Sequence, residues 1–393
     1  MSNITQKHII SIGCIVILAF VAYSNTFDSD WHFDDNPNII KNYSVHATTL
    51  SEIWNARHIN GTYARYCGFV SFAFNWYFHG KSVTGYHVTN LLIHIAVMVL
   101  VYCSVFLTLT LPSFKKVSFT SVWLVSLFTA LLWGLSPIQT EAVTYIVQRL
   151  TSLAALFFML SLVLFIKGRR CMLGRNTTPG IVFMCAALVM YMLAMLTKEN
   201  TIMLPFLILL YEHLFVRRMR TLKDRRIAAL ILILVAGFIF IAIARPGVLT
   251  VITKITKDYE KREFTLNERV LTQFRVIVRY LTLIVFPHPA RLNLDYNFQI
   301  SENIITPITT LFSILFIFGS IIFAIFARNK YPLISFCIFW FYVNNAIEST
   351  VIALEIIFEH RVYIPSIGII LMIVVLLFRF AERDLGCVRE EAV

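Results

Sequence analysis

Long apolar runs alternate with short polar segments along most of the chain. A membrane-spanning helix needs about 20 mainly apolar residues. Runs near that length occupy residues 8–24, 88–110, 118–136, 150–167, 180–197, 201–216, 227–244, 305–327, 333–348 and 363–380. This alternation predicts an all-α polytopic membrane protein with about 10 to 11 transmembrane helices.

One further run, LTQFRVIVRYLTLIVF (271–286), fits two arrangements. It carries Arg275 and Arg279, which are four residues apart and therefore share one face of a helix. Charged groups inside a span are costly and usually functional. The run either spans with its arginines turned into a cavity or lies along the interface. The second option keeps the C-terminal tail in the cytoplasm, which Arg328 and Lys330 favour.

Composition supports a membrane protein and excludes two other classes. Hydrophobic residues make up 58% of the chain and charged residues 14%, whereas a soluble domain is about a quarter charged. The net charge of +12 could suit nucleic acid, but the basic residues lie in short runs between apolar segments, as cytoplasmic loops do. The seven cysteines are scattered without a C-x-x-C, so neither a disulfide framework nor a zinc site is expected.

Basic residues also orient the chain. Lys115-Lys116, KGRRCMLGR (167–175) and RRMRTLKDRR (217–226) lie at alternate turns, which predicts that these turns and the N-terminus are cytoplasmic. The first apolar run is followed by Ser24-Asn25-Thr26 rather than by a small-x-small cleavage site. We therefore expect a retained first span.

The outer face then receives a long first loop, 25–87, and a second outer or interfacial region, 245–304. Within the first loop, LSEIWNARHI (50–59) is amphipathic and FVSFAFNWYFHG (69–80) is aromatic. Both patterns predict short helices on the membrane surface. We expect one integral-membrane domain, 1–393.

Two adjacent carboxylates, Asp34 and Asp35, stand in HFDDNPNII (32–40) at the start of this loop. Adjacent carboxylates repel each other, so one pKa tends to rise, which suits a general base acting on a hydroxyl. The pair could also hold a divalent metal such as Mg or Mn. A third explanation is an Asx turn before Pro37. Spacing alone leaves all three open.

Other polar groups beside the spans are functional candidates. His87, Asn90 and His94 share one helical face, where they could bind an anion or bond between helices. The rest lie in links between spans: Glu141 and Arg149, then Lys198 and Glu199, then Glu348, Glu355, Glu359, His360 and Arg361. Taken alone, the Lys198–Glu199 pair is explained by interfacial snorkelling. Together, carboxylates and cations beside lipid suit glycosyl transfer from a lipid phosphate. An Asp would deprotonate the acceptor hydroxyl, and the cations would hold the phosphate leaving group.

Several strings resemble one membrane enzyme family. They are HFDDNPNIIKN (32–42), GYHVTNLLIHI (85–95), SPIQTEAVTYIVQR (136–149), TKE (197–199), ERVLTQFRVIVRYL (268–281) with LNLDYNF (292–298), and EHRVYIPSIG (359–368). In this order they resemble the membrane portion of the transmembrane-and-tetratricopeptide-repeat O-mannosyltransferases and their shorter bacterial relatives. These proteins belong to the GT-C superfamily of glycosyltransferases that use lipid-phosphate sugars.

The resemblance implies a GT-C bundle with the active site at the outer leaflet, and a polyprenyl-phosphate-linked sugar as donor. It places the catalytic acid in the first outer loop, at Asp34 or Asp35. It implies a donor phosphate site at His87, His94, Arg149, Lys198 and Arg361. Supporting polar residues would be Asn90, Glu141, Glu199, Arg275, Arg279, Glu359 and His360. A short relative of this kind is expected in a bacterial inner membrane, with its active site on the periplasmic face.

Two departures from the family affect these expectations. The tetratricopeptide repeats are lacking, which leaves open whether the acceptor is a protein Ser or Thr, a glycan or a lipid. The sequence reads SPIQTE where the family usually has His before Pro, so a donor-site role for Ser136 is in doubt. Mannose is the expected sugar. The alternatives are an oligosaccharide ligase and a non-enzymatic lipid or sugar transporter; transporters often show matching halves, which this sequence does not.

Overall fold

The computed structural model describes residues 3–114, 117–216 and 258–384. The regular elements of these residues are all helical. By their contacts they form two compact units: Met1–Thr201 with Ile370–Val393, and Ile202–Ile369. The expectation of one domain over the whole chain stays a prediction.

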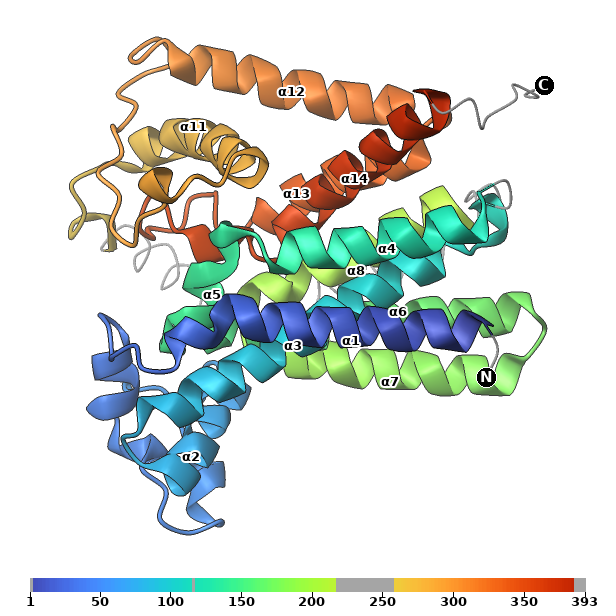
Figure 1. The fold of residues 1–393 in the computed structure, drawn as a ribbon. Helices are drawn as coiled ribbons and strands as arrows, with labels where there is room; N and C mark the ends of the chain where they lie inside the picture. The colour runs from blue at the N-terminus through green and yellow to red at the C-terminus, as the bar shows by residue number, and fades with distance from the viewer. Residues whose placement is uncertain (1–2, 115–116, 217–257, 385–393) are drawn as a thin grey trace. The chain divides into compact units, whose positions relative to one another are not determined.

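The first unit is a bundle of long apolar helices. Its members are α1 (Asn3–Tyr23), α3 (Val83–Leu109), α4 (Phe119–Gly134), α6 (Arg149–Leu173), α7 (Thr177–Met195) and the end of α14 (Pro365–Asp384). Helix α6 packs along α7 and α3, and α3 packs along α4 (Figure 1). A Cβ atom on Gly168 would lie 3.0 Å from the carbonyl oxygen of Gly180. Glycine therefore lets α6 and α7 approach closely, as small residues do between membrane helices.

The second unit contains α8 (Leu204–Tyr211), α11 (Leu266–Val285), α12 (Thr309–Ala327), α13 (Pro332–Asn345) and the start of α14. Helix α12 packs against both α11 and α13, and α8 packs against α13. The start of α11 is fixed by a capping box, in which Thr265 and Glu268 each satisfy a backbone N–H of the other.

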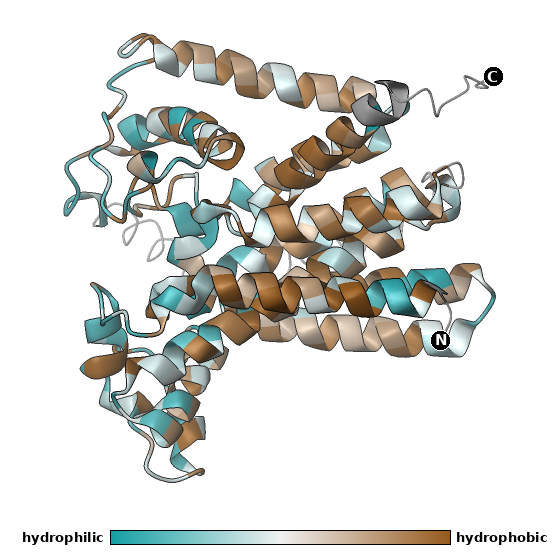
Figure 2. Cartoon of the chain, in the orientation of Figure 1, coloured by the Kyte–Doolittle hydropathy of each residue, from teal (hydrophilic) through white to brown (hydrophobic). Residues whose placement is uncertain are grey.

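Among the described residues, six helical segments are long and apolar enough to cross a membrane. A seventh forms if α4 and the segment Pro137–Thr144, bent by 55°, make one span. Hydrophobic residues line most of α1 (Figure 2). The all-α polytopic class is therefore confirmed.

The larger number of 10 to 11 spans and the GT-C arrangement stay predictions. The run 227–244 lies outside the described residues, and the run 271–286 falls in α11, which is not among the six segments. The run 333–348 corresponds to α13, of 14 residues. The run 363–380 corresponds to α14, whose segment Pro365–Arg379 is shorter than a full span.

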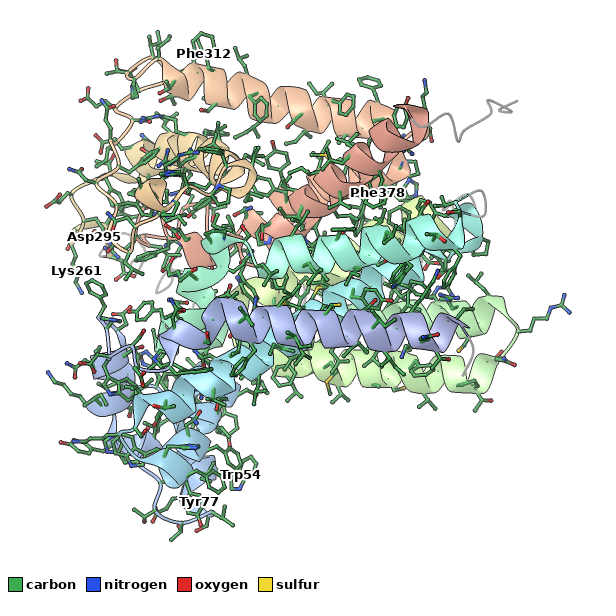
Figure 3. All side chains as sticks on the ribbon, in the orientation of Figure 1. Trp54, Tyr77, Lys261, Asp295, Phe312 and Phe378 are labelled. Carbon is green, nitrogen blue, oxygen red and sulfur yellow. The ribbon has the colours of Figure 1, made fainter. Side chains whose placement is uncertain are left out.

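The long first loop, 25–87, packs around a small apolar core. The predicted short helices are present as Glu52–Asn55 and α2 (Tyr66–His79). Buried apolar side chains from the whole loop pack together with four residues that precede or begin α6: Tyr145, Ile146, Val147 and Leu150. Trp54 and Tyr77 stay exposed on the loop (Figure 3). This shared core holds the loop against the link between α5 (Thr140–Thr144) and α6.

Candidate active site

The structure places the two adjacent acids in different environments. Asp35 is fully buried, and both of its carboxylate oxygens accept backbone hydrogen bonds. The N–H of Val147 donates to Oδ1 at 2.6 Å, and the N–H of His32 donates to Oδ2 at 3.0 Å. Asp34 is exposed, and none of the described residues donates a hydrogen bond to its carboxylate. One acid is therefore tied into the fold, and the other faces outward.

Burial raises the pKa of Asp35 to about 6, against the opposing effect of its two backbone hydrogen bonds. The neighbouring charge of Asp34 adds a smaller increase in the same direction. Loss of hydration disfavours the ionised form, and donors to the carboxylate favour it. Repulsion between adjacent acids, expected from the sequence, is thus the lesser cause.

The backbone around the pair is clamped to the link before α6. The N–H of Asp34 donates to the hydroxyl oxygen of Tyr145 at 2.7 Å, beside the bond from Val147 to Asp35. Phe33, between the clamped residues, has a φ of 34°. A bulky residue rarely adopts this left-handed conformation. It persists here between residues whose N–H groups are fixed on both sides.

Asn90 of α3 holds the link between α5 and α6 in place. Its amide donates to the carbonyls of Val143 at 3.1 Å and Ile146 at 3.4 Å. Its own oxygen accepts a bond of 2.6 Å from Nε of Arg149. Asn90 therefore joins the irregular backbone of the link to the first residue of α6.

Arg149 is fully buried among acceptors of the protein itself. Besides Asn90, its guanidinium donates to Oδ1 of Asn75, to the carbonyl of Ser71 at 3.2 Å and to that of Tyr86 at 3.0 Å. These bonds use most of the five N–H donors of a guanidinium. The donor-phosphate role expected for Arg149 stays a prediction.

The two histidines of α3 bond to different backbone carbonyls. Nε2 of His94 bonds with the carbonyl of Gly134 at 2.9 Å, deep in the bundle. Nε2 of His87 bonds with the carbonyl of Ser29 at 2.8 Å, which connects the first loop to α3. Nδ1 of His87 is buried without a hydrogen-bond partner among the described residues, as is the hydroxyl of Ser136. Such atoms are rare in native proteins and can mark a place where a ligand or water bonds.

The remaining candidates of the first unit divide by exposure. Nζ of Lys198 is buried and donates to the hydroxyl of Thr151 at 3.0 Å. Glu199 is exposed and pairs with Arg65 at 3.3 Å. Glu141 is buried in α5. The buried Nζ of Lys198 differs from the interfacial snorkelling that the sequence pattern predicts for the pair.

Arg361 lies in the second unit, where it is buried and holds backbone. It donates to the carbonyl of Glu355 at 2.7 Å and lies 3.9 Å from the carboxylate of Glu348. Glu359 accepts from the N–H of Asn293 at 2.7 Å and from the hydroxyl of Tyr296. The ring of His360 stacks on Phe358.

Sequence reasoning missed the residue that holds this segment most firmly, Arg269. It is fully buried and donates to the carbonyls of Glu348, Thr350, Leu354 and Glu355. Gln273 and Tyr280 of α11 bond to the carbonyls of Ile356 and Phe358. The signal was present in the sequence, because Arg269, Gln273 and Tyr280 share one helical face.

The two arginines expected in α11 serve a different part of the second unit. Arg275 donates to the carbonyl of Gln299 at 2.7 Å and lies over the ring of Phe298. Arg279 donates to the carbonyl of Arg291 at 3.4 Å. Both bind neighbouring loop backbone, and their supporting role in a donor site stays a prediction.

Among the described residues, the acid pair has few of the ligands that a divalent metal needs. Such an ion takes several oxygen ligands, yet both oxygens of Asp35 already accept backbone N–H groups. The described part of the chain contains no group of three or more His, Cys, Asp or Glu side chains that could hold a metal ion.

No family model matches the sequence, and no solved structure matches it. Its curated relatives include human protein O-mannosyl-transferase TMTC4, 27% identical over 223 residues, which are 52% of this chain and 29% of the relative. Protein O-mannosyl-transferase Tmtc3 of Drosophila melanogaster is 26% identical over 244 residues, 56% of this chain and 26% of the relative. Protein O-mannosyl-transferase tmtc2 of Xenopus laevis is 32% identical over 162 residues, 38% of this chain and 18% of the relative.

The chain spans less than a third of the length of these relatives. All three carry the name that the ordered strings of the sequence predicted, so the predicted resemblance is confirmed. Over about half of its length, the chain is similar to the TMTC protein O-mannosyl-transferases.

Proposed function

We propose that the chain is a GT-C-type glycosyltransferase that moves one mannose from a polyprenyl-phosphate carrier to a Ser or Thr hydroxyl of a protein. The names of the relatives support the sugar and the acceptor class. The lipid carrier, and the periplasmic face of a bacterial inner membrane as the place of reaction, rest on the resemblance of the ordered strings.

One observation supports this reaction most directly: the exposed carboxylate of Asp34 stands on a backbone that is fixed on both sides. A general base must reach the proton of its substrate while its own geometry is held. Asp35 lacks that freedom, because both of its oxygens accept protein N–H groups. We therefore assign the base to Asp34 and an anchoring role to Asp35.

In the proposed step, Asp34 takes the proton of the acceptor hydroxyl. The hydroxyl oxygen attacks C1 of the sugar and forms the new glycosidic bond. The bond between C1 and the phosphate oxygen breaks, and its electron pair leaves with the polyprenyl phosphate. The products are the glycosylated acceptor, the lipid phosphate and a protonated Asp34, which returns its proton to water.

Cations that hold the phosphate would stabilise the charge that develops on it. In the first unit, Lys198 is a buried cation whose Nζ donates to the hydroxyl of Thr151 at 3.0 Å. His87 adds a buried nitrogen without a partner among the described residues. We propose that these two residues contribute to the donor site, together with the expected His94 and Arg149.

The test measures mannose transfer in proteoliposomes with a polyprenyl-phosphate mannose and a Ser/Thr-rich acceptor peptide. Asp34→Asn should lower the transfer rate by about 100- to 10,000-fold, the usual range for loss of a general base. Asp35→Asn keeps the base and should cause a clearly smaller loss. Asp30→Asn, an exposed acid of the same loop, is the matched control and should leave the rate unchanged.

Equal rates for Asp34→Asn and the wild type would remove Asp34 from the mechanism. A larger loss in Asp35→Asn than in Asp34→Asn would reverse the assignment of the two acids. Transfer of a lipid-linked oligosaccharide, with no transfer of single mannose units, would refute the proposed reaction in favour of a ligase.

A further inference from the structure

The hydroxyl of Tyr145 is the only described side-chain group that bonds to the backbone of Asp34 from another part of the chain. The two residues are 111 positions apart, and the bond of 2.7 Å is short for an N–H donor. The Tyr145 side chain is 8% exposed, so little water competes for this contact. The bond therefore joins the outer loop to the link before α6 at the exposed acid itself.

The position of Tyr145 is itself fixed on both sides. Asn90 holds the carbonyls of Val143 and Ile146, the residues that flank Tyr145 closely in sequence. Two residues after Tyr145, the N–H of Val147 holds Asp35. The tyrosine thus stands on a rigid support that also anchors the second acid.

The hydroxyl of Tyr145 stays protonated and uncharged beside the acids. Burial raises the pKa of Tyr145, and the charges of Asp34, Asp35 and Glu141 raise it further. The group is therefore a neutral hydroxyl, which can accept the Asp34 N–H and still donate its own proton. A neighbouring carboxylate in this position would instead repel the base.

The left-handed backbone of Phe33 also depends on the bond between Asp34 and Tyr145. This conformation is unfavourable for a residue with a side chain, and its φ of 34° is found directly before Asp34. The bonds on either side, from His32 to Asp35 and from Asp34 to Tyr145, hold it in place. Loss of the tyrosine hydroxyl would let this turn relax and move the Asp34 carboxylate.

We propose that Tyr145 is a positioning residue that sets the orientation of Asp34 for proton transfer without contacting the sugar donor. This inference rests on the proposed function. It predicts that Tyr145→Phe lowers kcat for mannose transfer by about 10- to 100-fold, because small displacements of a reacting group have effects of this size. The KM for the polyprenyl-phosphate donor should stay within twofold of the wild-type value.

Tyr66→Phe is the matched control. The hydroxyl of Tyr66 donates to the carbonyl of Trp54 at 2.9 Å in the same loop. The two variants lose the same atom and a bond of similar length. A general weakening of the loop would therefore lower kcat in both, whereas the proposed role lowers it only in Tyr145→Phe.

Hydrogen exchange at the Asp34 amide adds a readout that does not depend on catalysis. Exchange should be at least about tenfold faster in Tyr145→Phe than in the wild type, because the amide loses its acceptor. Unchanged exchange would show that the bond does not hold the loop and would overturn the inference. Faster exchange with wild-type kcat would overturn it as well.

Failure of the proposed function gives a different result. A wild-type chain that transfers no mannose from this donor refutes the proposed reaction. The positioning role of Tyr145 is then refuted as well, because it concerns the rate of that reaction. A wild type that transfers mannose, with Asp34→Asn inactive and Tyr145→Phe fully active, leaves the proposed function standing and refutes only the positioning role.

Discussion

The raised pKa of Asp35 predicts how the stability of the folded protein depends on pH. The folded carboxyl has a pKa of about 6, against a usual value of 3.8. It therefore holds its proton more tightly than the unfolded chain does, so protonation favours the folded state. The free energy of unfolding should rise as the pH falls through 6 toward 3.8, and this contribution is lost again as the pH rises above 6.

The expected size follows from the two pKa values. Their difference corresponds to about 3 kcal/mol. About two thirds of it, or about 2 kcal/mol, falls between pH 7.5 and pH 4.5. Asp35→Asn removes the titrating group while keeping the size of the side chain. The amide can accept only one of the two N–H bonds from His32 and Val147, which changes the absolute stability of the variant but not its dependence on pH.

The assay compares the unfolding of wild type and Asp35→Asn in lipid nanodiscs at several pH values between 4.5 and 7.5. The other carboxylates titrate in both proteins, so they cancel in the difference. The wild type should gain about 2 kcal/mol relative to the variant toward pH 4.5. A difference in stability that stays constant across this range would show that the pKa of Asp35 is not raised, and would refute the burial argument.

Two further predictions concern the second unit. Gly368→Ala should destabilise the protein by about 1–3 kcal/mol, because the new Cβ would lie 2.8 Å from the carbonyl oxygen of Cys337. Gly319→Ala, where nothing lies within 4 Å, should be neutral or stabilising; similar effects in thermal unfolding would contradict this packing argument. Arg269→Gln should cost at least about 3 kcal/mol, because the buried carbonyl of Glu348 and the partly buried bonds to Thr350 and Glu355 lose their donor. The exposed Arg328→Gln should change stability by less than about 0.5 kcal/mol.

The long spans could be predicted from the sequence because the thickness of a membrane fixes their length. The runs 88–110 and 305–327 correspond closely to α3 and α12. The predicted run 150–167 is shorter than α6, which continues to Leu173 through basic residues. Such residues stay helical beyond the apolar core, since their long side chains can reach the headgroup layer.

The acid pair shows where sequence reasoning stops. Asp34 and Asp35 are identical in type and adjacent, so local sequence cannot rank them. Their difference comes from Tyr145 and Val147, which are more than a hundred residues away. The same limit applies to Arg149, whose charge alone indicates an anion site, whereas its guanidinium donates to Asn75 and Asn90.

The irregular link between α5 and α6 gives these separate contacts a common physical cause. Where a helix is interrupted near a membrane, backbone groups lose their partners and must find others within the protein. Asn90 satisfies the carbonyls of Val143 and Ile146, and Arg149 fixes Asn90 in turn. The N–H that the interruption frees at Val147 then becomes the donor that holds Asp35. The polar residues that first suggested ligand binding thus also build the support on which the exposed acid stands, and this is why their loss should impair transfer even where they do not touch the donor.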